Sequence, residues 1–115
     1  MATPFPICLE GKTTSIPGAL QHILQIGTEY AFCTIQISAV NDSLLNNAKI
    51  RVAISTASTP DAVSRLDFIE VADELSPGGR YTNFGVLVPG NNNVYVSAST
   101  SDVIFRVTGL AHVAV

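Results

Sequence analysis

Apolar and polar residues alternate along most of the chain, and short runs of turn-forming residues separate the alternating segments. The clearest case is the segment 30–40, whose apolar positions are Ala31, Cys33, Ile35, Ile37 and Ala39. A period of two places successive side chains on opposite faces of a β-strand, so this segment predicts a long strand with one apolar face. Residues 48–56 repeat the pattern with Lys49 and Arg51 on the polar side, which indicates a strand with one face in solvent.

Seven segments of this kind are separated by turn signals, of which residues 76–79 and 89–93 are the strongest because Gly, Pro and Asn suit tight turns. Strands are expected at residues 20–26, 30–40, 48–56, 66–71, 80–88, 94–99 and 103–108, with an optional eighth around 5–9. Residues 56–64 have the composition of an exposed loop. No long helical pattern interrupts the series. The sequence therefore predicts an all-β fold, an antiparallel and jelly-roll-like β-sandwich of about seven to eight strands.

The two ends of the chain differ from its middle. With 115 residues the chain is the size of one domain, and we expect one β-sandwich domain at 19–115 preceded by an extended N-terminal arm at 1–18. The arm alternates in a way that suits a strand added to another sheet, and its candidate docking residues are Phe5, Ile7 and Leu9. An edge strand of the chain's own domain is the alternative, and the sequence does not separate the two. Residues 110–115 stay apolar, which predicts that they are paired or docked.

Composition narrows the classes of partner. Charged residues make up only 13% of the chain, against roughly 25% in ordinary soluble domains, and the formal net charge is -3. The six basic residues form no cluster, which argues against a nucleic-acid partner. No apolar run approaches the roughly 20 residues of a membrane span. The N-terminus lacks the features of a secretory signal, so we expect the chain to be made in a cytoplasm and to leave it only within a larger particle.

Cysteines and histidines are the first candidates for chemistry. Cys8 and Cys33 lie in apolar, strand-like runs, and we interpret them as two buried reduced thiols, with a disulfide between them as the alternative. His22 and His112 alternate with apolar neighbours, which indicates outward-facing or hydrogen-bonded structural histidines. We therefore identify no nucleophile within reach of a base.

Acidic and aromatic residues give no site either. Asp67 and Glu70 are a carboxylate pair, but the chain has no Trp that would form a sugar platform beside them. No spacing suits a metal site. The aromatic residues are interpreted as core or cross-strand pairs: Phe5, Tyr30, Phe32, Phe68, Tyr81, Phe84, Tyr95 and Phe105. The sequence thus predicts no catalytic residue, no cofactor, no metal and no enzymatic activity.

Five strand and turn segments stand out together: Asp67-Phe68-Ile69-Glu70, Leu75-Ser76-Pro77-Gly78-Gly79, Gly85-Val86-Leu87-Val88-Pro89-Gly90, Val94-Tyr95-Val96-Ser97-Ala98-Ser99 and Phe105-Arg106-Val107-Thr108-Gly109. With these segments, the chain from residue 19 to 109 resembles small virion structural proteins of tailed bacteriophages. The resemblance implies a role in assembly, either as a capsid decoration (cement) protein or as a module of a tail or fibre. We prefer the decoration protein, which would bind the major capsid protein or other virion subunits, assemble in the host cytoplasm and stay on the capsid surface. The resemblance also implies a homo-oligomer, with a trimer favoured.

Two other classes remain open at this stage. One is a tail, baseplate or fibre module that binds a host surface or carbohydrate. The other is an enzyme, for which the sequence offers no constellation of reactive groups. Decoration is preferred over a fibre because the chain is short and has no internal repeat.

Overall fold

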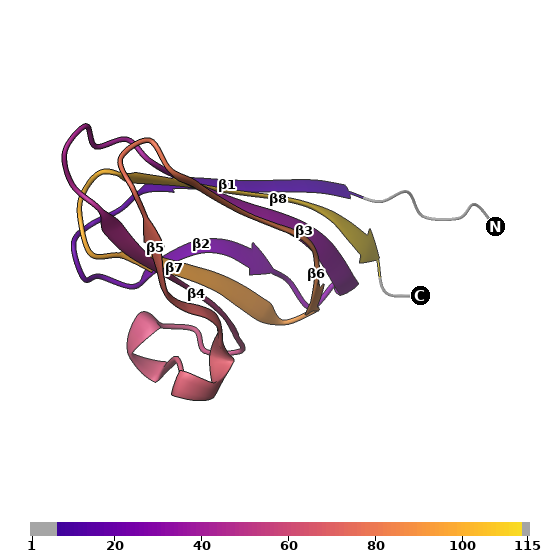
Figure 1. Cartoon of the computed structure of the whole chain (residues 1–115). Helices are drawn as coiled ribbons and strands as arrows, with labels where there is room; N and C mark the ends of the chain where they lie inside the picture. The colour runs from indigo at the N-terminus through magenta and orange to yellow at the C-terminus, as the bar shows by residue number, and fades with distance from the viewer. Residues whose placement is uncertain (1–6, 114–115) are drawn as a thin grey trace.

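Eight β-strands make up most of residues 7–113, which are the residues that the computed structural model describes (Figure 1). The strands are β1 (Ile7–Thr14), β2 (Gln21–Ile26), β3 (Tyr30–Asn41), β4 (Ala48–Ser55), β5 (Phe68–Leu75), β6 (Arg80–Pro89), β7 (Asn92–Ala98) and β8 (Val103–Val113). Two 3₁₀ turns, η1 (Pro60–Ala62) and η2 (Arg65–Asp67), lie between β4 and β5. Each segment that was expected to be a strand contains one, and the optional eighth is present as β1.

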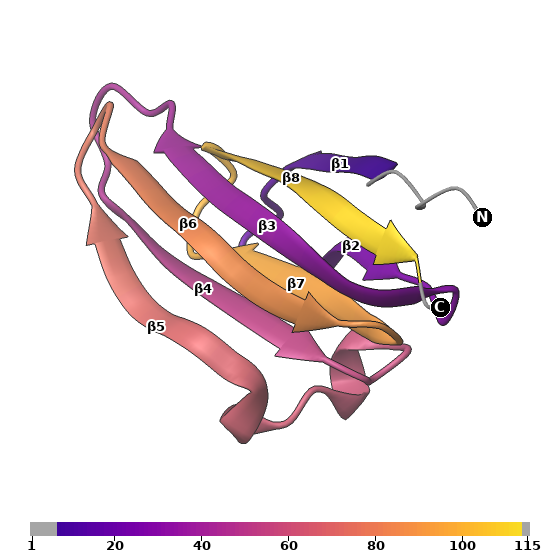
Figure 2. The same cartoon turned by 90° about the vertical axis from the view of Figure 1, so that its right-hand side faces the viewer.

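The strands form two four-stranded antiparallel sheets that stack face to face (Figures 1 and 2). Their strand orders are β1-β8-β3-β6 and β2-β7-β4-β5. Among the connections between successive strands, only β4 to β5 stays within one sheet, and every other one crosses between the sheets. Eight antiparallel strands in this order form a jelly roll. The prediction of a jelly-roll-like antiparallel sandwich is confirmed.

The core lies between the sheets, where alternate residues of each strand point inward. In β3, Cys33, Ile35 and Ile37 have at most 1% of their surface exposed, as the alternation in this segment predicts. Phe105 of β8 and Ile50 of β4 are also fully buried and belong to the same cluster. Burying a large aliphatic or aromatic side chain contributes about 1.5–3 kcal/mol, so this layer is the main source of stability.

The N-terminal segment belongs to the sandwich. β1 pairs with β8 in one continuous register, from Ile7 opposite Ala111 to Thr14 opposite Ile104, and Leu9 packs against the core. The arm predicted at 1–18 is therefore wrong for residues 7–14, which have the alternative structure, an edge strand of the chain's own domain. Burial of Leu9 within the chain favours this pairing. Phe5, the first of the candidate docking residues, lies outside the described residues.

The strand expected from residue 66 begins later. Leu66 lies in η2 with 88% of its surface exposed, and β5 starts at Phe68. A capping box causes the delay: the Ser64 side chain accepts a hydrogen bond from the Leu66 N–H, and the Asp67 carboxylate accepts one from the Ser64 N–H. These local bonds compete with strand pairing.

The segment between β4 and β5 covers part of the outer face of the β2-β7-β4-β5 sheet. Tyr95 points outward from β7, yet it is fully buried, and its hydroxyl donates a 2.6 Å hydrogen bond to the carbonyl oxygen of Ala57 in this segment. The Asn93 side-chain amide donates to the same oxygen at 2.9 Å. Figure 1 shows the two 3₁₀ turns of this segment beneath β4 and β7. The chain itself thus covers the outer side of this sheet around Tyr95, whereas Val71 of the edge strand β5 is 62% exposed.

Candidate docking surface

The outer face of the β1-β8-β3-β6 sheet carries large apolar side chains in solvent. Phe84 is 70% exposed, Leu87 63%, Leu110 47% and Phe32 37%. We call these four residues the apolar patch. Contiguous exposed apolar residues mark interaction surfaces more often than scattered ones do, so the patch is the candidate functional site.

Strand register brings the members of the apolar patch together. Leu110 of β8 lies opposite Thr34 of β3, and Thr34 lies opposite Leu87 of β6, so Leu110 and Leu87 flank one short polar side chain. Phe32 lies near them on β3, and its ring stacks on His112 with a centroid separation of 4.5 Å. Three neighbouring hydrogen-bonded strands hold the surface, which makes it rigid before any partner arrives.

A β-bulge presents Phe84. The pairing of β3 with β6 shifts between Ile35 and Ile37, and Gly85 at this point has φ of 69°. Only glycine adopts such a backbone at no steric cost, and the extra residue changes the direction in which the strand presents its side chains. An open hollow of about 540 Å³ lies beside the bulge, and its lining includes Phe84, Leu110 and Thr108.

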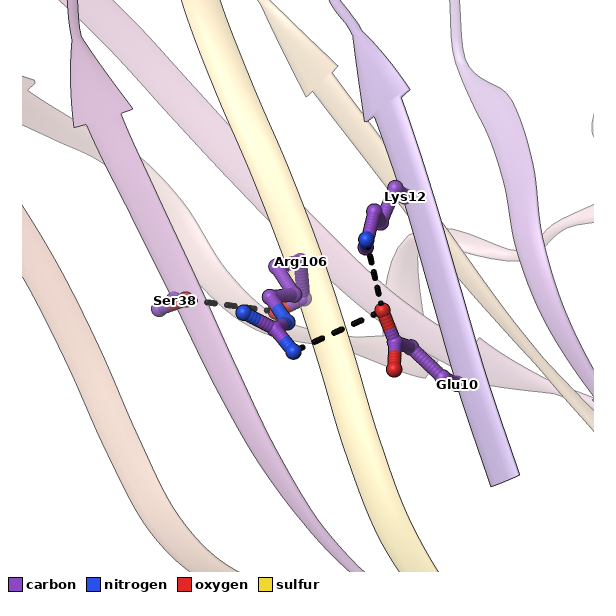
Figure 3. A network of polar contacts seen from close by, with 4 residues as sticks. All are labelled: Glu10, Lys12, Ser38 and Arg106. Carbon is purple, nitrogen blue, oxygen red and sulfur yellow. Dashed lines mark hydrogen bonds and ion pairs between the residues drawn. The ribbon is translucent and has the colours of Figure 1, made fainter. Parts of the chain in front are cut away.

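Charged residues lie next to the hollow (Figure 3). The Glu10 carboxylate is 3.0 Å from Lys12 Nζ and 3.5 Å from an Arg106 guanidinium nitrogen. The hydrogen bond from Lys12, followed by the positive charge of Arg106, lowers the pKa of Glu10. The Ser38 hydroxyl donates to the Arg106 carbonyl oxygen at 3.4 Å. These ion pairs are exposed and stabilise the fold little. They place a charged region, on β1 and β8, beside the apolar patch on the outer face of the sheet.

Leu44 and Leu45 form a second exposed apolar feature, in the loop between β3 and β4. This loop follows the C-terminal end of β3, whereas Phe32 lies near the N-terminal end of the same strand. The two leucines are therefore separate from the apolar patch. They lie on a loop and have no neighbouring strands to hold them, so we take the patch as the main candidate.

The two cysteines behave differently from each other. Both are free thiols, but Cys8 is exposed and lines the hollow, whereas Cys33 is buried in the core. The interpretation of two buried thiols is wrong for Cys8, because its position in β1 faces outward. Burial raises the pKa of Cys33, which keeps this thiol protonated and unreactive.

The histidines have structural partners. The His22 Nε2 atom lies 2.9 Å from Asn93 Oδ1, and its ring packs against Tyr95. His112 stacks on Phe32 at the border of the apolar patch. Both match the expected structural histidines, and neither lies within the hollow.

Asp67, one member of the carboxylate pair, is bonded within its own turn. Asp67 accepts hydrogen bonds from the Ser55 hydroxyl at 2.7 Å and from the Ser64 N–H at 2.9 Å, and these bonds lower its pKa. Its role is to fix the turn before β5. Within residues 7–113, no group of three or more His, Cys, Asp or Glu side chains lies close enough to hold a metal ion. No helix in the same range is long and apolar enough to cross a membrane.

Sequence reasoning missed the apolar patch. Phe84 was interpreted as a core or cross-strand aromatic residue, but it points into solvent. The sequence did contain a sign of the patch, because apolar residues occupy outward as well as inward positions of these strands. Phe32 precedes the inward Cys33, and Leu110 precedes the inward Ala111.

Comparison with known proteins adds no assignment to this geometry. The sequence matches no protein-family model, and the search of curated proteins finds no similar sequence.

Proposed function

We propose that the chain is a non-enzymatic structural protein that docks through the apolar patch onto an assembled protein shell. The observation that carries the proposal is the difference between the two outer faces. The chain's own segment covers the first around Tyr95 and leaves Val71 exposed on its edge strand, whereas the second groups Phe84 and Leu87, both more than 60% exposed, with Leu110 and Phe32 on neighbouring strands. A partner that covers the second face gains the apolar burial that the fold leaves unused.

The partner class follows from the resemblance to virion proteins of tailed bacteriophages. Within that class we propose a capsid decoration protein, bound to the major capsid protein or to other virion subunits on the outside of the shell. Because such a protein binds the assembled shell and not its separate subunits, it stabilises the shell by mass action. The low proportion of charged residues, 13%, suits a module that lies against other subunits. The resemblance further implies three copies in the free protein.

Co-sedimentation with capsids tests the proposal. Purified phage heads that lack this protein are mixed with the wild type, with the double variant F84S/L87S, and with the control L66S. Leu66 is 88% exposed, more than any residue of the apolar patch, but it lies in η2 between β4 and β5. We expect saturable binding at a fixed stoichiometry by the wild type and by L66S, and strongly reduced binding by F84S/L87S. Failure of the wild type to bind heads at micromolar concentration, or equal binding by all three proteins, would refute docking through the patch.

A second candidate function has one observation in its favour. The hollow combines the exposed ring of Phe84 with the polar side chains of Gln36, Thr108 and Glu10. An aromatic ring beside hydrogen-bonding groups suits a sugar ring, as in a tail, baseplate or fibre module that binds host-surface carbohydrate. Binding to a glycan array that is abolished by F84A and retained by L66S would favour this function over decoration.

A further inference from the structure

β1 is an edge strand that has charged side chains but no bulge or register shift. Its register with β8 is unbroken over all eight residues. The other three edges are irregular: β2 and β5 contain register shifts, and β6 contains the bulge at Gly85 and ends at Pro89. Bulges and prolines prevent one sheet edge from pairing with another. Among the strands of residues 7–113, β1 is therefore the edge best suited to accept a further strand.

The hydrogen-bonding groups at this edge can be assigned. The Ser15 N–H donates to the Val103 carbonyl oxygen at 2.8 Å, so Ser15 bonds toward β8. Antiparallel ladders alternate, so the even-numbered residues of β1 direct their main-chain groups away from β8. The Gln21 side-chain amide donates to the Thr14 carbonyl oxygen at 3.2 Å, which agrees with this assignment. The main-chain groups that point to the open edge belong to Cys8, Glu10, Lys12 and Thr14, although the Thr14 carbonyl oxygen already accepts the bond from Gln21.

The charges along the edge are self-complementary. The side chains of Glu10 and Lys12 lie on the exposed outer face, with Gly11 between them. If two β1 strands pair antiparallel about a two-fold axis at Gly11, Glu10 of each copy lies opposite Lys12 of the other. An axis at Glu10 or at Lys12 would instead place like charges opposite each other, which is unfavourable. Only the Gly11 register thus combines main-chain pairing with opposite charges.

We infer that two copies of this chain join edge to edge through β1, antiparallel about a two-fold axis at Gly11. The two β1-β8-β3-β6 sheets then form one continuous sheet, an isologous contact of the kind found in closed dimers. Because the axis is perpendicular to the sheet, both apolar patches lie on the same side of it. The inference stands on β1 alone and goes beyond the proposed docking, and the pair differs from the trimer that the resemblance implies.

Charge exchange tests the register. Light scattering of the free wild type should give the mass of two chains. E10K and K12E each place like charges opposite each other twice per dimer, and we expect each to weaken dimerisation about ten-fold or more. The double variant E10K/K12E restores opposite pairs and should dimerise like the wild type. K49E, a charge reversal at an exposed lysine of β4, is the matched control and should leave the mass unchanged.

A cysteine pair tests the same register independently of affinity. In the inferred dimer, Cys8 of one copy lies opposite Thr14 of the other. Within one chain these positions are six residues apart, about 20 Å along the strand, which is too far for a disulfide. Mild oxidation of T14C should therefore give a disulfide-linked dimer, while the wild type and C8S/T14C should not. A free protein with the mass of one chain or of three, together with no cross-linking of T14C, would overturn the inference. So would a double charge variant as weak as the single ones.

Discussion

Asn41 is buried at the end of β3, where its side chain joins three segments. Its amide nitrogen lies 2.8 Å from the Asn46 carbonyl oxygen, 3.0 Å from that of Leu75 and 3.2 Å from that of Ser76. Its Oδ1 atom accepts the Ser43 N–H at 3.1 Å. One side chain thus holds the β3–β4 loop against the turn between β5 and β6.

The expected cost of Asn41→Ala follows from these bonds. Each net hydrogen bond contributes about 0.5–1.5 kcal/mol, and a buried group that is left without a partner costs about 1–3 kcal/mol. The hydrogen bond from Asn41 to the Leu75 carbonyl oxygen is fully buried, so in the variant this oxygen is left without that partner. We therefore expect the free energy of unfolding to fall by about 2–4 kcal/mol, which lowers the Tm by roughly 8–16 °C in a domain of this size.

Asn41→Asp separates hydrogen bonding from side-chain volume. The introduced carboxylate has no N–H to donate and would face three carbonyl oxygens, so the folded state raises its pKa above the ordinary value of about 3.9. A carboxyl group with a raised pKa binds more protons in the folded state than in the unfolded state. Stability therefore falls as the pH rises through the unfolded and then the folded pKa. We expect N41D to be less stable than N41A at pH 7 and to recover as the pH falls toward 4.

Urea unfolding followed by circular dichroism measures both effects. Asn47→Ala, at an exposed position of the same loop, is the control and should change the free energy of unfolding by less than about 0.5 kcal/mol. The reasoning is refuted if N41A unfolds within that margin of the wild type. A difference between N41D and the wild type that does not depend on pH would refute it as well.

Three further predictions concern stability and reactivity. Gly11→Ala should lower the free energy of unfolding by about 3 kcal/mol in urea melts, because a β-carbon there would lie 2.0 Å from the Ile23 main-chain oxygen. The hydrogen bonds that lower the pKa of Asp67 stabilise the fold at pH values above its ordinary pKa of 3.8, and this contribution is lost as the pH falls through the lowered pKa of the folded state. The Tm of D67N should therefore be below that of the wild type at pH 7 and should converge with it in acid. A maleimide should label one thiol of the native protein, Cys8, and should reach Cys33 only after denaturation, as mass spectrometry of the labelled peptides would show.

Sequence alternation predicted the strands well wherever one face was apolar and the other polar. The segment 30–40 corresponds to β3 within a residue, and Lys49 and Arg51 lie on the outward side of β4 as predicted. Predictions failed where a local side-chain bond decides the conformation. Strand β5 starts late because Asp67 closes a capping box, which the pattern of apolar residues does not record.

The sequence did not predict the apolar patch, for a different reason. Periodicity assigns residues to two faces of a strand but does not say what covers each face. Tyr95 and Leu87 are both large residues on outward faces, yet a loop covers the first and nothing within residues 7–113 covers the second. Only the packing of segments far apart in sequence distinguishes them.

The place of β8 between β1 and β3 has a consequence for biosynthesis. The first strand of the sandwich is held in its sheet by the last one, so β1 has no partner in that sheet until the ribosome has released residues 103–113. In a nascent chain without residues 103–113, β1 is therefore unpaired and the apolar patch lacks Leu110. Pairing strands so distant in sequence is slow, because the entropy of closing the long intervening chain is lost before any contact is gained. The sheet that we propose docks on a shell is thus completed late, when the whole sandwich is available to fold.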